Sequence, residues 1–200
     1  MDSRFLSSTL ILIRHSQSQQ EPERPASQWP LTKAGRRRCI ALAARLAAYA
    51  PDLIVTSRER KASTTGALVA AQLALPAIVA DGLHEHQREQ VGWLSNPAFE
   101  QAVVAFFTRP DELVFGEETA GQAGARFDAA VRDVLAAHPG QTVAIVSHGT
   151  VMTLFVAQHA DVAPLPFWKR LGMPAIVVMS LPDLGLLEVI ERIERATPNP

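Results

Sequence analysis

Short runs of apolar residues recur along the chain, and polar or turn-forming residues bound each of them. The first run, at residues 10–13, reads Leu-Ile-Leu-Ile and contains no polar position. Such a run is typical of a strand that is buried on both faces of a sheet. Similar short apolar runs, each followed by a polar residue or a turn, lie at residues 53–56, 77–80, 143–146, 175–179 and 187–190. We predict a strand at each.

Longer stretches with apolar residues at helical spacing separate most of these strands. Thr32 is placed to cap the first of these helices, whose apolar stripe reaches Leu46. The others are predicted at residues 62–73, 97–107, 119–137 and 151–157. Alternation of strand and helix favours parallel strands with right-handed crossovers. We therefore predict an α/β protein, a three-layer α/β/α sandwich with a mostly parallel central sheet.

Two of the buried runs end on side chains that can do chemistry. The first run ends on Arg14 and His15, and the run at 143–146 is followed by Ser147 and His148. If these strands are parallel neighbours, both histidines lie at the sheet edge where α/β proteins bind ligands. Arg14 can offer a planar fork to two phosphate oxygens. His148 also precedes a predicted helix, whose first amides favour anions. This combination predicts a phosphate-binding site.

Composition narrows the class of protein further. With 200 residues, 48% of them hydrophobic, the chain is long enough for one domain with a sizeable core. A net charge of −1 gives no sign of a nucleic-acid or membrane partner. The single cysteine, Cys39, fits a reducing compartment, and Met1 to Leu6 lack the apolar core of a signal peptide. We expect a cytoplasmic protein with a small-molecule partner, and leave its oligomeric state open, a homodimer included.

Residues 84–118 interrupt the alternation of strand and helix. They begin with a segment dense in ionisable groups and continue into the predicted helix at 97–107. Insertions between sheet elements are frequently the parts of a domain that contact substrate. We therefore interpret 1–200 as a single domain with a cap-like insertion around 84–118.

Several motifs resemble those of one family. The segment Arg14-His15-Ser16-Gln17-Ser18 resembles the Arg-His-Gly signature of the histidine phosphatase superfamily, which includes the phosphoglycerate mutases. Ser147-His148-Gly149 resembles its second histidine motif. Further segments match the family's other motifs in the same order along the chain: Leu31 to Gly35, Ser57 to Thr65, Leu83-His84-Glu85, and Gly116 to Thr119 with Arg126.

The resemblance implies a phosphoglycerate mutase-like fold and an activity that needs neither a metal ion nor a cofactor. By position, His15 matches the histidine that becomes phosphorylated and is later hydrolysed, and Glu85 matches the proton donor. Arg14, His148 and Gly149 match positions that bind the phosphate. A carboxyl group can act as an acid near neutral pH only if its pKa is raised. The negative charge of a bound phosphate would raise it.

The second basic motif departs from the family pattern. That pattern usually runs Ser-Pro-Leu-x-Arg-Ala, and aligning Ser57 and Ala62 with it leaves Lys61 at the arginine's place. Lysine carries a point charge and lacks the bidentate fork of arginine. Either Lys61 binds the phosphate directly or Arg58 supplies the second cation. We favour Lys61 because its position matches.

Other departures concern substrate recognition. Ser16 replaces the usual glycine, and the family's asparagine a few residues later is missing, so Gln17 or Ser18 is a candidate for its role. His86 and Arg88 are further candidates for substrate contacts. His84 and His86 could instead be metal ligands, but no cysteine partner or His-Glu-x-x-His spacing accompanies them. We therefore expect no metal site.

These observations predict a phosphatase, a phosphoric monoester hydrolase of the histidine acid type, that acts on a small phosphorylated substrate through a phosphohistidine. Two alternatives stay open. A phosphoglycerate-type mutase belongs to the same family, but mutases are usually longer and carry a Trp-Asn pair that is absent here. A catalytically silent phosphate-binding or interaction module is favoured only by Lys61. The sequence contains neither a P-loop nor a Gly-x-Ser-x-Gly elbow.

Overall fold

The computed structural model describes residues 9–194 of the chain. The prediction about Met1 to Leu6 lies outside them. The strands are β1 (Thr9–Arg14), β2 (Leu53–Thr56), β3 (Ala77–Val79), β4 (Val143–Ser147), β5 (Ala175–Ser180) and β6 (Leu186–Ile190). The α-helices are α1 (Lys33–Leu46), α2 (Arg60–Leu73), α3 (Asn96–Thr108), α4 (Ala120–Ala137), α5 (Gly149–His159) and α6 (Pro164–Arg170). Two short 3-10 helices lie at Ala26–Gln28 and Ala47–Tyr49.

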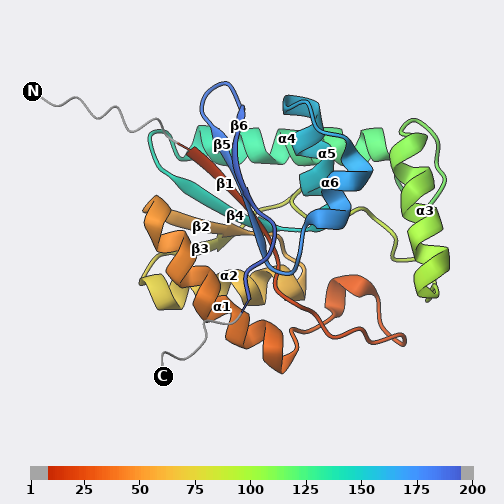
Figure 1. Cartoon of the computed structure of the whole chain (residues 1–200), viewed down its shortest axis with the longest axis horizontal. Helices are drawn as coiled ribbons and strands as arrows, with labels where there is room; N and C mark the ends of the chain where they lie inside the picture. Colours follow the sequence, from red (N-terminus) through yellow and green to blue (C-terminus); the bar gives the residue numbers. More distant parts are fainter. Residues whose placement is uncertain (1–8, 195–200) are drawn as a thin grey trace, which may run out of the picture.

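The six strands form one sheet in the order β3-β2-β4-β1-β5-β6. Strands β3, β2, β4 and β1 are parallel neighbours, while β5 runs antiparallel to β1 and β6 antiparallel to β5. Helices α1 and α2 cover one face, and α4 and α5 cover the other (Figure 1). The structure therefore confirms the three-layer architecture and the mostly parallel sheet.

Strand β1 shows why the run at residues 10–13 has no polar position. Side chains alternate between the two faces of a strand. Leu10 and Leu12 accordingly pack in the core under α4 and α5, while Ile11 and Ile13 pack in the core under α1 and α2. All four are fully buried. A strand with helices on both faces has no side that a polar residue could expose to water.

Side-chain caps define where two of the helices, α1 and α4, begin. The Thr32 hydroxyl accepts a hydrogen bond from the Gly35 amide at 2.8 Å, which confirms the predicted cap of α1. Thr119 and Gln122 form a reciprocal capping box at the start of α4. These caps satisfy amides that the first turn of a helix leaves without partners.

Two segments lie beyond the carboxyl ends of the parallel strands (Figure 1). One is the loop from residue 17 to residue 30, which contains the first 3-10 helix. The other is the segment 84–118, which includes α3. Among the residues that the structure describes, no helix is long and apolar enough to cross a membrane.

Two helix glycines provide a test of the packing between helices and sheet. A Cβ atom on Gly66 of α2 would lie 2.2 Å from Thr56 Cγ2, whereas one on Gly124 of α4 would lie 3.6 Å from Leu154 Cβ. We expect Gly66→Ala to lower the free energy of unfolding by about 1–3 kcal/mol, since Thr56 is stiff and α2 must move. Gly124→Ala, the control, should stabilise by up to about 1 kcal/mol through helix propensity.

Urea unfolding of the two variants, followed by circular dichroism, measures both effects. Equal effects of the two substitutions would contradict the close approach of α2 to β2.

Candidate active site

The site begins where β1 and β4 end. These strands pair in parallel with Arg14 opposite Ser147, and the His15 amide donates a hydrogen bond of 2.9 Å to the Ser147 carbonyl. The rings of His15 and His148 consequently lie with their centroids 5.2 Å apart. The pairing of the two strands confirms the prediction that both histidines meet at one edge of the sheet.

A main-chain contact fixes the tautomer of His15. Its Nδ1 lies 2.7 Å from the Ser16 carbonyl oxygen, which can only accept, so Nδ1 carries the proton. The lone pair is then on Nε2. Burial lowers the pKa of His15 well below its usual range, and the nearby His148, Lys61 and Arg14 lower it further. A neutral imidazole with a free Nε2 is a nucleophile at neutral pH.

His148 occupies the N-cap position of α5. It is fully buried, and its Nε2 lies 2.9 Å from Ser57 Oγ. Its Nδ1 is buried without a hydrogen-bond partner among residues 9–194. Burial lowers its pKa well below the usual range, with repulsion from Lys61 as the next cause. A buried polar atom of this kind leaves a hydrogen bond available to a ligand.

Arg14 packs against the start of α5. Its Nη1 donates to the Leu171 carbonyl, while its Nε is buried and has no partner in the described part of the chain. A Cβ atom on Gly149 would lie 2.8 Å from Arg14 Cζ. Only glycine at this position lets the guanidinium approach the helix N-terminus so closely.

Lys61 is almost completely buried, with 4% of its surface exposed. Its Nζ donates to the Ala26 carbonyl at 2.6 Å and lies 2.7 Å from a carboxylate oxygen of Glu59. Burial raises the pKa of Glu59, but the charge and hydrogen bond of Lys61 outweigh it, and the net shift is downward. Glu59 is therefore an ionised partner of Lys61.

Sequence reasoning missed Glu59. The family's motif has leucine at this place, so a carboxyl group next to an already unusual lysine was the signal that could have found it. Its other carboxylate oxygen accepts a hydrogen bond of 2.7 Å from the Glu85 amide and lies 3.6 Å from His148 Nε2. Glu59 therefore links Lys61, Glu85 and His148.

The Glu85 carboxylate lies against the N-terminus of α5. It accepts hydrogen bonds from the amides of Thr150 and Val151, both at 3.2 Å, and from that of His86 at 3.0 Å. Burial raises the pKa of Glu85, but the neighbouring His148 and Arg88 and the hydrogen bond from the His86 amide lower it, and the net shift is downward. In the ligand-free protein Glu85 is a carboxylate. A raised pKa, which proton donation needs, has to come from a bound anion.

Arg126 of α4 fixes the segment that carries Glu85. Its guanidinium donates to the carbonyls of Gly82 at 2.7 Å, His84 at 3.0 Å and Glu85 at 3.2 Å. It also forms an ion pair of 2.5 Å with Glu118. These bonds to three successive parts of one loop restrict the position of the Glu85 backbone.

A cavity of about 400 Å³ opens above these groups. We call it the aromatic cavity because tryptophan and phenylalanine side chains form much of its wall. Of the residues discussed so far, it is lined by Arg14, His15, Ala26, Lys61, Glu85 and Thr150. Ser18 and Arg88, both predicted substrate contacts, also line it. Its volume lies within the range of small-molecule sites.

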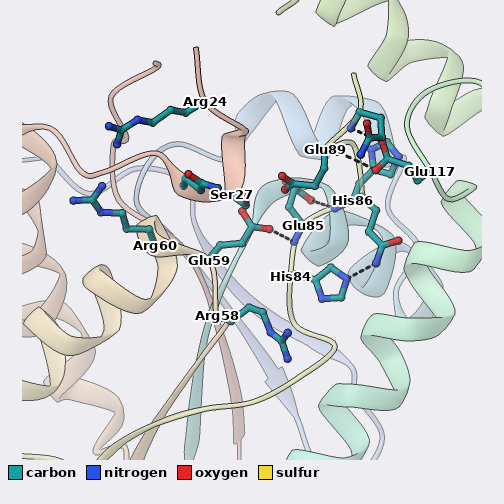
Figure 2. A pocket seen from close by; sticks show the side chains of 13 residues that line it. Arg24, Ser27, Arg58, Glu59, Arg60, His84, Glu85, His86, Glu89 and Glu117 are labelled. Carbon is teal, nitrogen blue, oxygen red and sulfur yellow. Dashed lines mark hydrogen bonds between the residues drawn. The ribbon is translucent and has the colours of Figure 1, made fainter. Parts of the chain in front are cut away.

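A second cavity, of about 720 Å³, adjoins the first, since Arg24, Glu85 and Glu89 line both, and we call it the outer cavity. Figure 2 shows Glu59 and Glu85 adjacent to each other within it, and Arg24 and Arg60 at one side. Glu85 lines both cavities. Arg58 lines only the outer one and forms a surface ion pair with Asp81.

Two other predicted contacts, Gln17 and His86, do not line the aromatic cavity. The Gln17 side chain accepts a long hydrogen bond of 3.4 Å from the Thr32 hydroxyl. The His86 ring is buried against Phe106 and Phe115, with centroids 4.1 and 5.1 Å apart, and it lines the outer cavity. Across residues 9–194 no three His, Cys, Asp or Glu side chains are grouped so that they could bind a metal ion.

The fold and the site together define an α/β protein in which two buried, neutral histidines lie among buried cations beside a cavity of small-molecule size. The family model of the histidine phosphatase superfamily (branch 1) matches residues 10–182. The chain belongs to this superfamily. A comparison with curated protein sequences finds no match.

Solved structures with the same fold include YhfR of Bacillus stearothermophilus, at 23% identity and a TM-score of 0.74, covering 92% of this chain and 96% of that one. The mycobacterial glucosyl-3-phosphoglycerate phosphatase with inorganic phosphate shares 20% identity, TM-score 0.75, over 95% and 100% of the two chains. The phosphoserine phosphatase of Entamoeba histolytica with 3-phosphoglyceric acid shares 18%, TM-score 0.70, over 96% and 98%.

The buried histidines predict a pH dependence of stability. The pKa of His15 is depressed in the folded state, so below about pH 6.5 the unfolded chain binds the proton and the folded one does not. Stability should therefore fall as the pH drops below 6.5, by up to about 1.4 kcal/mol per pH unit for this group. His15→Gln should show a shallower fall.

Urea unfolding at intervals between pH 7.5 and 5.5 measures both slopes. His138→Ala, at the C-cap of α4, is the matched histidine control. If the wild type and His15→Gln lose stability in parallel, His15 is not buried as a neutral group.

Proposed function

We propose that the chain is a phosphomonoesterase that works without a metal ion, through phosphorylation of His15. The observation that supports this most is the hydrogen bond between His15 Nδ1 and the Ser16 carbonyl. It leaves Nε2 unprotonated in a site whose other basic groups can neutralise a phosphate. Membership of the superfamily supports the same function, as do the phosphatase names of the mycobacterial and Entamoeba proteins.

In the proposed complex, the phosphoryl group contacts four groups of the chain. The Arg14 guanidinium and the Lys61 ammonium supply positive charge. His148 donates a hydrogen bond, and the Gly149 amide adds the N-terminal end of the α5 dipole. These donors are fixed before the substrate binds, so they need little rearrangement as charge develops in the transition state.

In the first step, His15 Nε2 attacks phosphorus. The N–P bond forms as the P–O bond to the alcohol breaks, and a protonated Glu85 gives its proton to the alcohol oxygen. The phosphate dianion supplies the negative charge that raises the pKa of Glu85 from its low value in the ligand-free protein. Arg126 is a positioning residue in this scheme because it fixes the loop of Glu85.

In the second step, water replaces the alcohol. Glu85, now a carboxylate, accepts a proton from a water molecule whose oxygen attacks phosphorus. The N–P bond breaks, inorganic phosphate is released, and His15 Nε2 regains its lone pair.

Residues 84–118 serve as a cap in this proposal, within a single domain. The one cysteine, Cys39, is buried and free, and we place the enzyme in the cytoplasm.

The test of the covalent step uses His15→Ala. With the nucleophile removed, we expect no turnover and no phosphoenzyme. Wild-type protein, quenched during turnover of a ³²P-labelled ester, should carry label that is labile to acid and stable to base. His138→Ala should be labelled like the wild type. Label on a serine, or full activity without any label, would refute the mechanism.

A second prediction separates Lys61 from Arg58. Lys61→Ala removes a preorganised cation, so kcat/KM should fall by roughly 100- to 1000-fold. Arg58→Ala breaks only a surface ion pair with Asp81 and should leave kcat/KM near the wild-type value. Steady-state kinetics with one ester measures both.

The loss of Lys61 also leaves Glu59 buried without its cation, which could lower activity by itself. The double variant Glu59→Gln, Lys61→Ala controls for this, and we expect it to stay impaired. If Arg58→Ala is the damaging change and Lys61→Ala is nearly silent, Arg58 supplies the second cation.

A further inference from the structure

All three tryptophans of the 200-residue chain line the aromatic cavity. Trp29 comes from the loop after β1, Trp93 from the segment before α3, and Trp168 from α6. Phe99 of α3 and Phe115 complete the set of rings. Segments far apart in sequence thus contribute every tryptophan of the chain to the cavity next to His15. The chemistry of phosphate transfer alone does not require aromatic side chains there.

The rings form two groups. Trp29 and Trp93 lie with centroids 6.2 Å apart. Phe99 lies 5.9 Å from Phe115, edge to face, and 6.3 Å from Trp168. Trp93 exposes 48% of its surface and the others except Phe115 are half-buried, so ring surface remains available to a ligand. Aromatic rings at these spacings prefer to pack against another ring.

The ring of Trp29 connects this wall to the phosphate pocket. Its Nε1 donates hydrogen bonds to the carbonyls of Glu21 at 3.0 Å and Arg24 at 3.1 Å. Lys61 Nζ lies 5.9 Å from the ring centroid. These hydrogen bonds fix the Trp29 ring next to Lys61, the cation proposed to bind phosphate.

Arg88 lies over the two phenylalanine rings of the cavity. Its guanidinium carbon lies 5.1 Å from the ring centroid of Phe99 and 5.7 Å from that of Phe115. Its Nη1 is buried without a hydrogen-bond partner in the described part of the chain. Cation–π contact holds the planar group where a flat ligand could stack on it, next to Arg14 and Glu85.

We infer that the preferred substrates are phosphate monoesters whose alcohol carries a flat aromatic ring. The inference rests on the proposed function, since it assigns the alcohol portion of the ester to the aromatic cavity. In the proposed complex the phosphoryl group lies at His15. The ring of the alcohol packs between the two groups of aromatic rings described above, with Arg88 over one end.

The first test compares esters whose leaving groups match. 2-Naphthylmethyl phosphate, benzyl phosphate and glycerol 3-phosphate are all esters of primary alcohols, so ring size varies while the bond that breaks stays similar. We expect KM to fall in the order glycerol, benzyl, naphthylmethyl. Equal KM values, or a preference for glycerol 3-phosphate, would overturn the inference and leave the proposed phosphatase standing.

Variants locate the effect. Phe99→Ala and Trp168→Ala should each raise KM for 2-naphthylmethyl phosphate by roughly 5- to 100-fold, the usual cost of losing one stacking partner. KM for glycerol 3-phosphate should change little. Leu113→Ala, an exposed position of the same insertion, should change neither. Trp168→Leu keeps an apolar side chain if the alanine variant does not fold.

A binding measurement separates this inference from the catalytic proposal. Isothermal titration calorimetry of inactive His15→Ala should show 2-naphthylmethylphosphonate binding more tightly than methylphosphonate, because only the former reaches the aromatic walls. No hydrolysis of any ester together with this difference in affinity would refute the phosphatase and retain the aromatic site. Equal affinities for both phosphonates would refute the aromatic site.

Discussion

The in-register pairing of β1 with β4 is the constraint on which the site depends. It places two histidines side by side, both almost completely buried, with 5% of the surface of His15 and none of that of His148 exposed. Two imidazolium cations could not share such a place, because burial and mutual repulsion both disfavour their charge. The site is therefore built from neutral histidines, and its positive charge comes from Arg14, Lys61 and Arg88. Glu59 and Glu85 are ionised, and their negative charges offset the cost of burying that positive charge.

The apolar runs were enough to predict the strands. For the buried strands β1, β2, β4 and β5 the reason is that helices on both faces leave almost no position exposed to water, whereas the edge strands β3 and β6 are largely exposed. They also predicted that the first and the fourth strand carry their histidines to one edge. They did not predict that β5 runs against β1. A fully buried run such as 175–179 is equally apolar in either direction, and only the connections around it determine which direction the chain takes.

The site was predictable where a residue acts alone at the end of an element, and unpredictable where the feature exists only through tertiary contact. Lys61 stood out by its position in a motif, but its pairing with Glu59 and the Ala26 carbonyl requires the loop after β1 to fold over α2. The tryptophans at 29, 93 and 168 show no pattern in sequence. Only the fold brings them to one cavity.

Glu85, together with Arg24 and Glu89, lines both the aromatic cavity and the outer cavity, whereas His15 lines the aromatic one alone of the two. If Glu85 transfers the proton as proposed, the alcohol occupies the aromatic cavity while water approaches the carboxylate from the outer one. In that mechanism, water that is already present at Glu85 favours hydrolysis of the phosphohistidine over return of the phosphoryl group to the same alcohol. The partition of the phosphohistidine between water and the alcohol, rather than the identity of the nucleophile, would then decide whether an enzyme with this fold is a hydrolase or a transferase.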